Sequence, residues 1–137
     1  MTDLDVRGLV ARILPSSAVD GPGNRAVVFL QGCDFDCSYC HNPETRAPCI
    51  HCGLCVGACP AAALGMEAGA VLWDPARCLD CGACIAACPH DSSPKTEIMT
   101  VAEVLARLER YRPFLRGITV SGGECGLQPE FLEALLR

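Results

Sequence analysis

Cysteine spacing constrains this chain more than any other feature of its sequence. Eleven of its twelve cysteines fall into three ordered sets, and only Cys125 stands apart. The first set has the spacing C-x3-C-x2-C, and each later set has the spacing C-x2-C-x2-C-x3-C followed by proline. In chain order the sets are Cys33, Cys37 and Cys40, then Cys49, Cys52, Cys55 and Cys59, then Cys78, Cys81, Cys84 and Cys88. Thiols gathered in this way indicate a fold built around metal clusters.

The rest of the composition favours metal ligation over disulfides. Residues 1–5 contain two aspartates and no basic group, and no apolar stretch of signal-peptide type follows them. We therefore expect a reducing, cytoplasmic setting, in which disulfides are rare. Zinc also binds C-x2-C pairs, but longer runs that end in Cys-Pro are typical of iron–sulfur clusters. With no apolar run that could cross a membrane and no long basic run, neither a membrane nor nucleic acid is expected as a partner.

The three sets predict clusters of two kinds. Both later runs have the pattern that holds [4Fe–4S] clusters in bacterial two-cluster ferredoxins. The first set offers only three thiolates to a cubane of four irons, so one iron would remain open. An open iron can bind and activate a small molecule, whereas a fully ligated cluster only passes electrons.

The two later runs form an internal repeat. Residues 49–60 recur 29 positions later as residues 78–89, and seven of the twelve positions are identical. Gly53 and Gly82 occupy the same place, where a chain wrapped around a cubane needs a tight turn. In the two-cluster arrangement the fourth cysteine of each run ligates the other cluster. The expected ligand sets are therefore Cys49, Cys52, Cys55 and Cys88 for the first cluster, and Cys78, Cys81, Cys84 and Cys59 for the second.

Outside the repeat, the hydrophobic pattern alternates between strands and helices. Strands are predicted at 9–14, 26–30 and 117–120, and helices at 101–111 and 129–137. Thr100 and Glu103 form a capping box before the first of these helices, and Pro113 is expected to stop it. Between the two cysteine runs, residues 70–73 predict one more short strand.

The alternation predicts an α/β fold with parallel strands, interrupted by a ferredoxin-like α+β insert. We expect residues 1–46 to carry the first strand and the three-cysteine loop, residues 47–95 to form the insert, and residues 96–137 to continue the α/β part. Two strand–helix units do not complete a barrel, which typically needs about 200–250 residues. We therefore interpret the chain as the amino-terminal portion of a longer protein.

Several segments resemble the start of glycyl-radical-enzyme activating enzymes, which belong to the radical S-adenosylmethionine (SAM) superfamily. They are residues 19–25 (VDGPGNR), 27–33 (VVFLQGC) and 37–43 (CSYCHNP). A dicluster insert and then the segment 120–124 (VSGGE) follow in the order of the insert-bearing, YjjW-type branch of that family. The resemblance covers essentially the whole chain. It implies a partial (β/α) barrel, of which the first two units are present here.

The resemblance also implies a catalytic site. In that family three loop cysteines bind a [4Fe–4S] cluster, SAM chelates the open iron, an aromatic residue packs near the adenine, and a GGE segment contacts the SAM amino group. The matching positions are Cys33, Cys37 and Cys40 for the cluster, Tyr39 for the aromatic residue, and Gly122, Gly123 and Glu124 for the GGE segment. Reductive cleavage of SAM would then give methionine and a 5′-deoxyadenosyl radical, which abstracts hydrogen from a glycine of a partner enzyme.

The implied cofactors are three [4Fe–4S] clusters and SAM. The implied partners are a glycyl radical enzyme as the protein substrate and a flavodoxin or ferredoxin as the electron donor. The insert would relay electrons, with structural stiffening and partner docking as the alternatives. Two other functions stay open: a radical SAM oxidoreductase with a different substrate, and a ferredoxin-type electron carrier, which would have no use for an open iron.

A few residues outside the cluster sets have two interpretations. Asp20 and Arg25 match family positions near the active-site mouth, but they also suit a turn aspartate and a strand-start arginine. Cys125 follows the GGE segment where many relatives have proline, and we interpret it as a spare buried thiol. Trp73 is interpreted as packing under the ferredoxin-like lobe rather than as an electron conduit.

Overall fold

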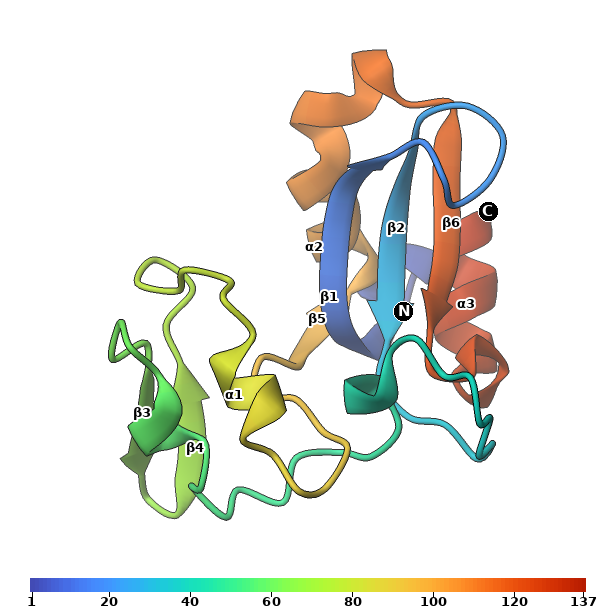
Figure 1. The fold of residues 1–137 in the computed structure, drawn as a ribbon. Coiled ribbons are helices and arrows are strands. Elements are labelled where there is room, and N and C mark those ends of the chain that lie inside the picture. Colours follow the sequence, from blue (N-terminus) through green and yellow to red (C-terminus); the bar gives the residue numbers. More distant parts are fainter.

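A four-stranded mixed sheet forms the framework of the larger lobe. The structure is a computed structural model and describes residues 1–137. The strand order is β5 (Glu97–Thr100), β1 (Arg7–Ser17), β2 (Arg25–Leu30) and β6 (Gly117–Gly122). Strands β2 and β6 are parallel, whereas β1 is antiparallel to both of its neighbours. Leu30 pairs with Gly122, so the carboxyl ends of β2 and β6 meet at one end of the sheet (Figure 1).

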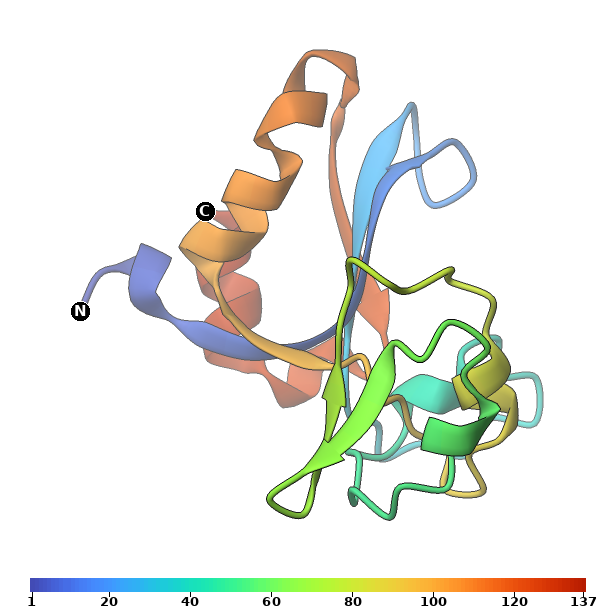
Figure 2. The same ribbon diagram turned by 90° about the vertical axis from the view of Figure 1, so that its left-hand side faces the viewer.

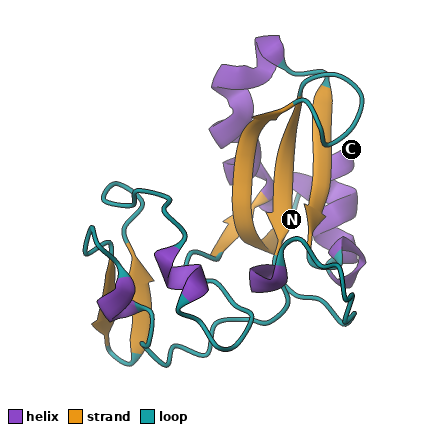
Figure 3. Cartoon of the chain, in the orientation of Figure 1, coloured by secondary structure: helices purple, strands orange, loops and turns teal.

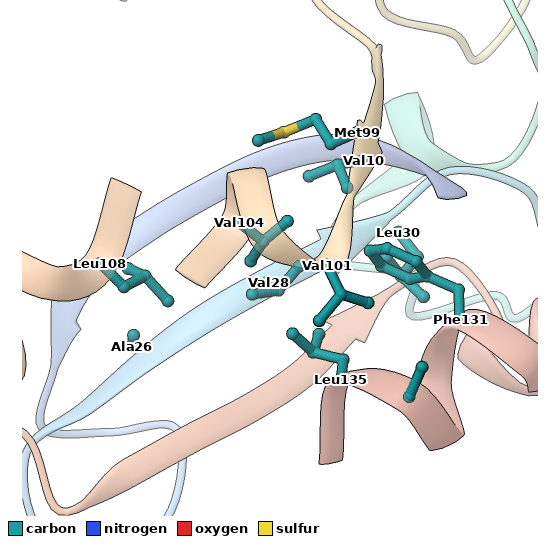
Figure 4. Close-up of a cluster of buried hydrophobic side chains, with 11 residues drawn as sticks. Val10, Ala26, Val28, Leu30, Met99, Val101, Val104, Leu108, Phe131 and Leu135 are labelled. Atoms are coloured by element: carbon teal, nitrogen blue, oxygen red, sulfur yellow. The ribbon is translucent and has the colours of Figure 1, made fainter. Parts of the chain in front are cut away.

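Two helices, α2 (Val101–Leu108) and α3 (Pro129–Leu136), pack on one face of this sheet (Figure 1, Figure 3). Alternate side chains of β2 point toward them, because successive residues of a strand face opposite sides. The core between sheet and helices is drawn in Figure 4 and consists of Val10, Ala26, Val28, Leu30, Met99, Val101, Val104, Leu108, Phe131, Ala134 and Leu135. Val27, on the other face of β2, is also fully buried. This strand is therefore buried on both faces, as its continuous apolar run predicts.

The capping box expected before α2 is present. The Thr100 hydroxyl accepts the N–H of Glu103 at 3.2 Å, and a Glu103 carboxylate oxygen accepts the N–H of Thr100 at 2.7 Å. The hydrogen bonds from the backbone and side chain of Thr100 lower the pKa of Glu103. Val101 and Val104 then turn into the core, which gives the helix its buried face.

Replacing Thr100 by alanine should lower the free energy of unfolding by about 1 kcal/mol, because one N-terminal N–H of α2 loses its acceptor. Thr100→Ser keeps the hydroxyl and should stay within about 0.5 kcal/mol of the parent protein. Urea unfolding followed by circular dichroism measures both variants. If both variants lost the same free energy of unfolding, the hydroxyl of residue 100 would not stabilise the helix.

The smaller lobe, which we call the insert, is formed by residues between the three-cysteine loop and β5. It contains a hairpin of β3 (Leu64–Glu67) and β4 (Ala70–Trp73) and the one-turn helix α1 (Ala83–Ala86). Both views place it beyond the end of the sheet at which β2 finishes (Figure 1, Figure 2). Its small core of four buried residues consists of Cys55, Leu64, Val71 and Cys84.

The insert joins the larger lobe through a narrow neck. The Ala47 N–H donates to the carbonyl of Asp91 at 3.1 Å, and Arg46 forms an ion pair with the Asp91 carboxylate at 3.2 Å. Arg46 also contacts the carboxylate of Asp36, within the three-cysteine loop, at 2.9 Å. The insert is therefore tied to the loop that precedes it.

The structure keeps the predicted strand–helix alternation in β2, α2, β6 and α3. The parallel arrangement predicted for the sheet holds only for β2 and β6, because the short turn between β1 and β2 cannot form a parallel crossover. Strands β3 and β5 were not predicted. Helix α2 ends at Leu108, earlier than expected, and a 3-10 helix over Glu109–Phe114 follows with Pro113 inside it. In an α-helix the ring of Pro113 would clash with the carbonyl of Glu109, which explains why the geometry changes there. None of the helices has the length and apolar composition needed to cross a membrane.

Candidate functional site

The three-cysteine loop begins directly after β2, at the end of the sheet where β2 and β6 both finish. Its first residue is anchored, because the Cys33 N–H donates to the carbonyl of Arg46 at 3.0 Å. Cys33 is half-buried, whereas Cys37 and Cys40 are exposed in a turn closed by a 3.1 Å bond from the Cys40 N–H to the Cys37 carbonyl. The loop thus has a fixed start and presents two of its thiols to solvent.

The glycine segment after β6 lies against the start of this loop. The N–H of Gly123 donates to the carbonyl of Leu30 at 3.0 Å, and the N–H of Glu124 donates to the carbonyl of Gly32 at 2.9 Å. Gly122 has a φ of +110°, and a Cβ there would lie 2.3 Å from the Leu30 carbonyl oxygen. A Cβ on Gly123 would lie 2.1 Å from the Gly32 carbonyl oxygen. Only glycines allow this close approach of the two backbones.

Two further predicted site residues complete this end of the sheet. Glu124 is half-buried, and its carboxylate accepts the N–H of Gly126 at 2.8 Å. Tyr39 lies within the cysteine loop with its side chain exposed to solvent. The cysteine loop therefore carries an aromatic ring beside its thiols, and the adjacent glycine segment carries an acidic group.

Gln31, between β2 and the loop, is a buried polar residue that the sequence analysis did not single out. Its side-chain amide donates to the carbonyls of Glu44 at 3.0 Å and Ala47 at 2.5 Å, and its amide oxygen accepts the Thr96 hydroxyl at 2.9 Å. Its own carbonyl accepts a side-chain N–H of Gln128 at 3.0 Å. Gln31 thus connects the end of β2 to Glu44, which follows the cysteine loop, and to Ala47 and Thr96 at the two ends of the insert. A glutamine at the end of a fully apolar strand was the signal that could have identified it.

The insert contains two small cavities, each lined by four cysteines. The cysteines are Cys49, Cys52, Cys55 and Cys88 in the first cavity, and Cys59, Cys78, Cys81 and Cys84 in the second. Each cavity therefore combines three cysteines of one run with the last cysteine of the other, which is the grouping that crossed ligation requires.

Two orphaned polar atoms test whether these cavities suit iron–sulfur clusters. The buried side-chain atoms that lack a hydrogen-bond partner are Trp73 Nε1 and Ser92 Oγ. Ser92 lines the first cavity and Trp73 lines the second. Both atoms carry hydrogens, and an indole N–H can only donate. The sulfur atoms of a cluster would supply the missing acceptor in each cavity, so the residues present fit the group.

The backbone of the two cysteine runs repeats along with the sequence. His51 and Asp80, at equivalent positions, have φ values of 57° and 51°, and Gly53 and Gly82 have φ values of 78° and 75°. The N–H of His51 donates to Cys49 Sγ at 3.4 Å, and the N–H of Asp80 donates to the equivalent cysteine sulfur at 3.4 Å. The runs therefore form twin loops, each of which turns an N–H toward its first cysteine.

Local environment shifts the pKa of several insert thiols. Burial raises the pKa of Cys55 and of Cys84. The backbone N–H of Ala63 donates to Cys59 Sγ at 3.2 Å and lowers the pKa of that thiol.

No three His, Cys, Asp or Glu side chains lie close enough together to hold a single metal ion.

Asp20 and Arg25 lie away from the cysteine loop. Arg25 begins β2 opposite Gly117, at the amino ends of the parallel pair. Its guanidinium donates to Thr119 Oγ1 at 2.7 Å and to the carbonyl of Ile118 at 2.6 Å, and the Thr119 hydroxyl donates to the carbonyl of Asp20 at 2.8 Å. These contacts favour the structural interpretation of both residues.

Comparison with known families identifies the same parts of the chain. A family described as "4Fe-4S dicluster domain" matches residues 41–89, and one described as "4Fe-4S single cluster domain" matches residues 19–59. Together the two matches span the three-cysteine loop and both cysteine runs of the insert.

Activating enzymes are its curated relatives. The chain is 39% identical to the (2S)-3-sulfopropanediol sulfolyase activating enzyme of Bilophila wadsworthia (strain 3_1_6), with 100% of the chain and 51% of that enzyme covered. It is 34% identical to the choline trimethylamine-lyase activating enzyme of Oleidesulfovibrio alaskensis (97% and 49% covered) and 33% identical to the pyruvate formate-lyase-activating enzyme of Clostridium pasteurianum (96% and 38%). The chain spans about half the length of the first of these relatives, at 51%. The resemblance to activating enzymes of glycyl radical enzymes is confirmed.

Proposed function

We propose that this chain carries the SAM-cleaving site of a radical SAM activase. The observation that supports this most directly is the contact between the glycine segment and the cysteine loop, through the hydrogen bonds of Gly123 and Glu124 to Leu30 and Gly32. A ligand held at the loop would lie beside a backbone without side chains and beside the Glu124 carboxylate. That carboxylate complements an ammonium group such as the amino group of SAM.

Each part of this end of the sheet has a proposed role. Cys33, Cys37 and Cys40 hold one [4Fe–4S] cluster, and Tyr39 packs near the adenine of SAM. Gly122 and Gly123 admit the amino-acid end of SAM. When bound, the cluster supplies one electron to the sulfonium of SAM, so that methionine and a 5′-deoxyadenosyl radical form. The strands β2 and β6 are the first two parallel strands of the proposed partial barrel, whose site lies at their carboxyl ends.

The insert, residues 47–95, binds two further clusters in this proposal, which brings the total to three. Cys49, Cys52, Cys55 and Cys88 hold one, and Cys59, Cys78, Cys81 and Cys84 hold the other. The crossed lining of the two cavities and their orphaned donors support this assignment. The insert relays electrons from a cytoplasmic flavodoxin or ferredoxin to the cluster of the three-cysteine loop. That loop belongs to the proposed radical SAM domain, which consists of residues 1–46 and 96–137.

The substrate is a glycyl radical enzyme, from which the radical removes a glycine hydrogen. The similarity to activating enzymes over 100% of the chain favours this substrate over that of another radical SAM oxidoreductase. A ferredoxin-type carrier is disfavoured, because a carrier needs neither a three-cysteine loop nor a glycine segment beside it.

Electron paramagnetic resonance (EPR) of the anaerobically reconstituted, reduced protein tests the proposal. SAM should change one signal, and 5′-deoxyadenosine should accumulate under reducing conditions. About 12 irons per chain, four for each cluster, are expected. About eight irons with no response to SAM would contradict the proposal and support the electron carrier.

Replacing Ser92 by alanine should lower the reduction potential of the first insert cluster, because a hydrogen bond to a cluster sulfur stabilises the reduced state. The Ser92 hydroxyl has no partner within the protein, so its removal leaves no other group unsatisfied. Ser16→Ala is the control, since Ser16 lies in β1 outside both cavities and its hydroxyl already donates to Asn24 Oδ1 at 2.7 Å. A redox titration measures both variants, and an equal shift in each would contradict the role of Ser92.

A further inference from the structure

The two cavities of the insert differ in charge. The lining of the first cavity has no lysine or arginine, and its one histidine, His90, is exposed, whereas Lys95 lines the second cavity. The Lys95 side chain is only 14% exposed, and its Nζ lies 2.7 Å from Asp80 Oδ1. The Asp80 side chain is 70% exposed and faces the groove outside the second cavity. The ammonium is therefore shielded from solvent beside the cavity, while its counter-ion is screened by water.

Hydrogen bonds to cysteine sulfur differ in the same direction. Both cavities receive the equivalent N–H bond at the first cysteine of their run, from His51 and from Asp80. His51 Nδ1 also lies 3.9 Å from Cys49 Sγ, but it accepts the N–H of Val71 at 3.1 Å and so does not donate to the sulfur. The second cavity gains another, from the N–H of Ala63 to Cys59 Sγ at 3.2 Å. Cys88, the equivalent cysteine of the first cavity, accepts no such bond. The orphaned donors do not offset this difference, because each cavity has one.

A cluster becomes more negative when it accepts an electron. A nearby positive charge and additional N–H bonds to sulfur therefore stabilise the reduced state and raise the reduction potential. Both features are found at the second cavity, so they act together on the same cluster.

We propose that Lys95 makes the second insert cluster, held by Cys59, Cys78, Cys81 and Cys84, the more easily reduced of the two. Lys95 acts on the cluster through its positive charge and does not ligate iron. An electron that enters the insert is then held at the cluster beside the groove between the insert and β1, which Arg12, Trp73 and Lys95 help to line. This inference rests on the proposed function of the insert as a holder of two clusters.

Lys95 keeps its charge at neutral pH in spite of its burial. Burial opposes protonation, but the hydrogen bond and charge of Asp80 outweigh it and raise the pKa of Lys95, and thiolates at Cys78 and Cys84 act in the same direction. The charge that acts on the second cavity is therefore constant over the range in which the protein would be studied.

The test is an EPR-monitored redox titration of the full chain in which Cys33, Cys37 and Cys40 are all replaced by alanine, so that only the insert clusters remain. Two separate reductions are expected. Lys95→Met should lower the midpoint of the more easily reduced cluster and narrow the separation. Asp80→Asn should raise the same midpoint, because it removes the carboxylate and leaves the ammonium. Asn tolerates the left-handed backbone of this position, so this variant keeps the test decisive if Lys95→Met loses iron.

Arg77→Met is the matched control. It removes one positive charge next to Cys78, but Arg77 is exposed and lies outside the lining of the cavity. Its midpoints should stay at the parent values. The inference is overturned if Asp80→Asn leaves both midpoints unchanged, if it moves the less easily reduced cluster, or if Arg77→Met shifts the midpoint as much as Lys95→Met. Loss of all iron from the insert of the parent protein would instead contradict the proposed function.

Discussion

Replacing Cys37 by alanine should abolish the response of the reduced protein to SAM and lower the iron content from about 12 to about eight atoms per chain. Two thiolates cannot hold the cubane at the loop, whereas the insert cavities keep all their cysteines. Cys37 is exposed, so the free energy of unfolding without metal should change by less than about 0.5 kcal/mol. Iron analysis, EPR with and without SAM, and 5′-deoxyadenosine assays measure the effect.

Cys125→Ala is the control for this prediction. Cys125 is the one cysteine outside the three sets, and it is partly buried against the core of the larger lobe. Its loss should leave the iron content and the SAM response unchanged. If Cys37→Ala retained about 12 irons and the SAM response, the loop would not hold the catalytic cluster.

Replacing Gly122 by alanine should destabilise the larger lobe by about 3 kcal/mol and remove the SAM response. The new Cβ would lie 2.3 Å and 2.4 Å from the carbonyl oxygen and the nitrogen of Leu30, and the φ of +110° is strained for any side chain. Relief requires β6 to move away from β2, which separates the glycine segment from the cysteine loop. Chemical denaturation and the EPR response to SAM measure the two effects.

Gly57→Ala is the matched control, because a Cβ at Gly57 meets no atom within 4 Å. Its stability should remain within about 0.5 kcal/mol of the parent protein. A Gly122→Ala protein with the stability and SAM response of the parent would contradict the close approach on which the site depends.

Much of the candidate site could be predicted because its information is local. Ligand spacing within a cysteine run is set by a few residues, and the crossed pairing of Cys59 and Cys88 follows from the known two-cluster ferredoxin arrangement. The proximity of the glycine segment to the loop could also be expected, because both follow buried strands of a parallel pair and the carboxyl ends of such strands meet.

Other features depend on contacts that no local pattern records. The partners of Gln31 are mainly backbone carbonyls, which are present in every sequence, so only the fold shows that it joins the loop to the insert. Strand β5 has only four residues, and its last residue, Thr100, is also the N-cap of α2. The capping-box pattern of Thr100 and Glu103 indicates a helix start, which obscured the short strand before it. The charge of Lys95 gains meaning only from its burial beside the second cavity.

The neck at Ala47 and Asp91 has a consequence for how such a protein is assembled over evolutionary time. Because the two residues are already hydrogen-bonded neighbours, a short turn could replace everything between them without displacing β2 or β5. The insert could thus be removed as one segment without changing the rest of the fold. A lineage could gain or lose the two proposed cluster sites in a single genetic event, while the three-cysteine loop and the glycine segment stay where they are.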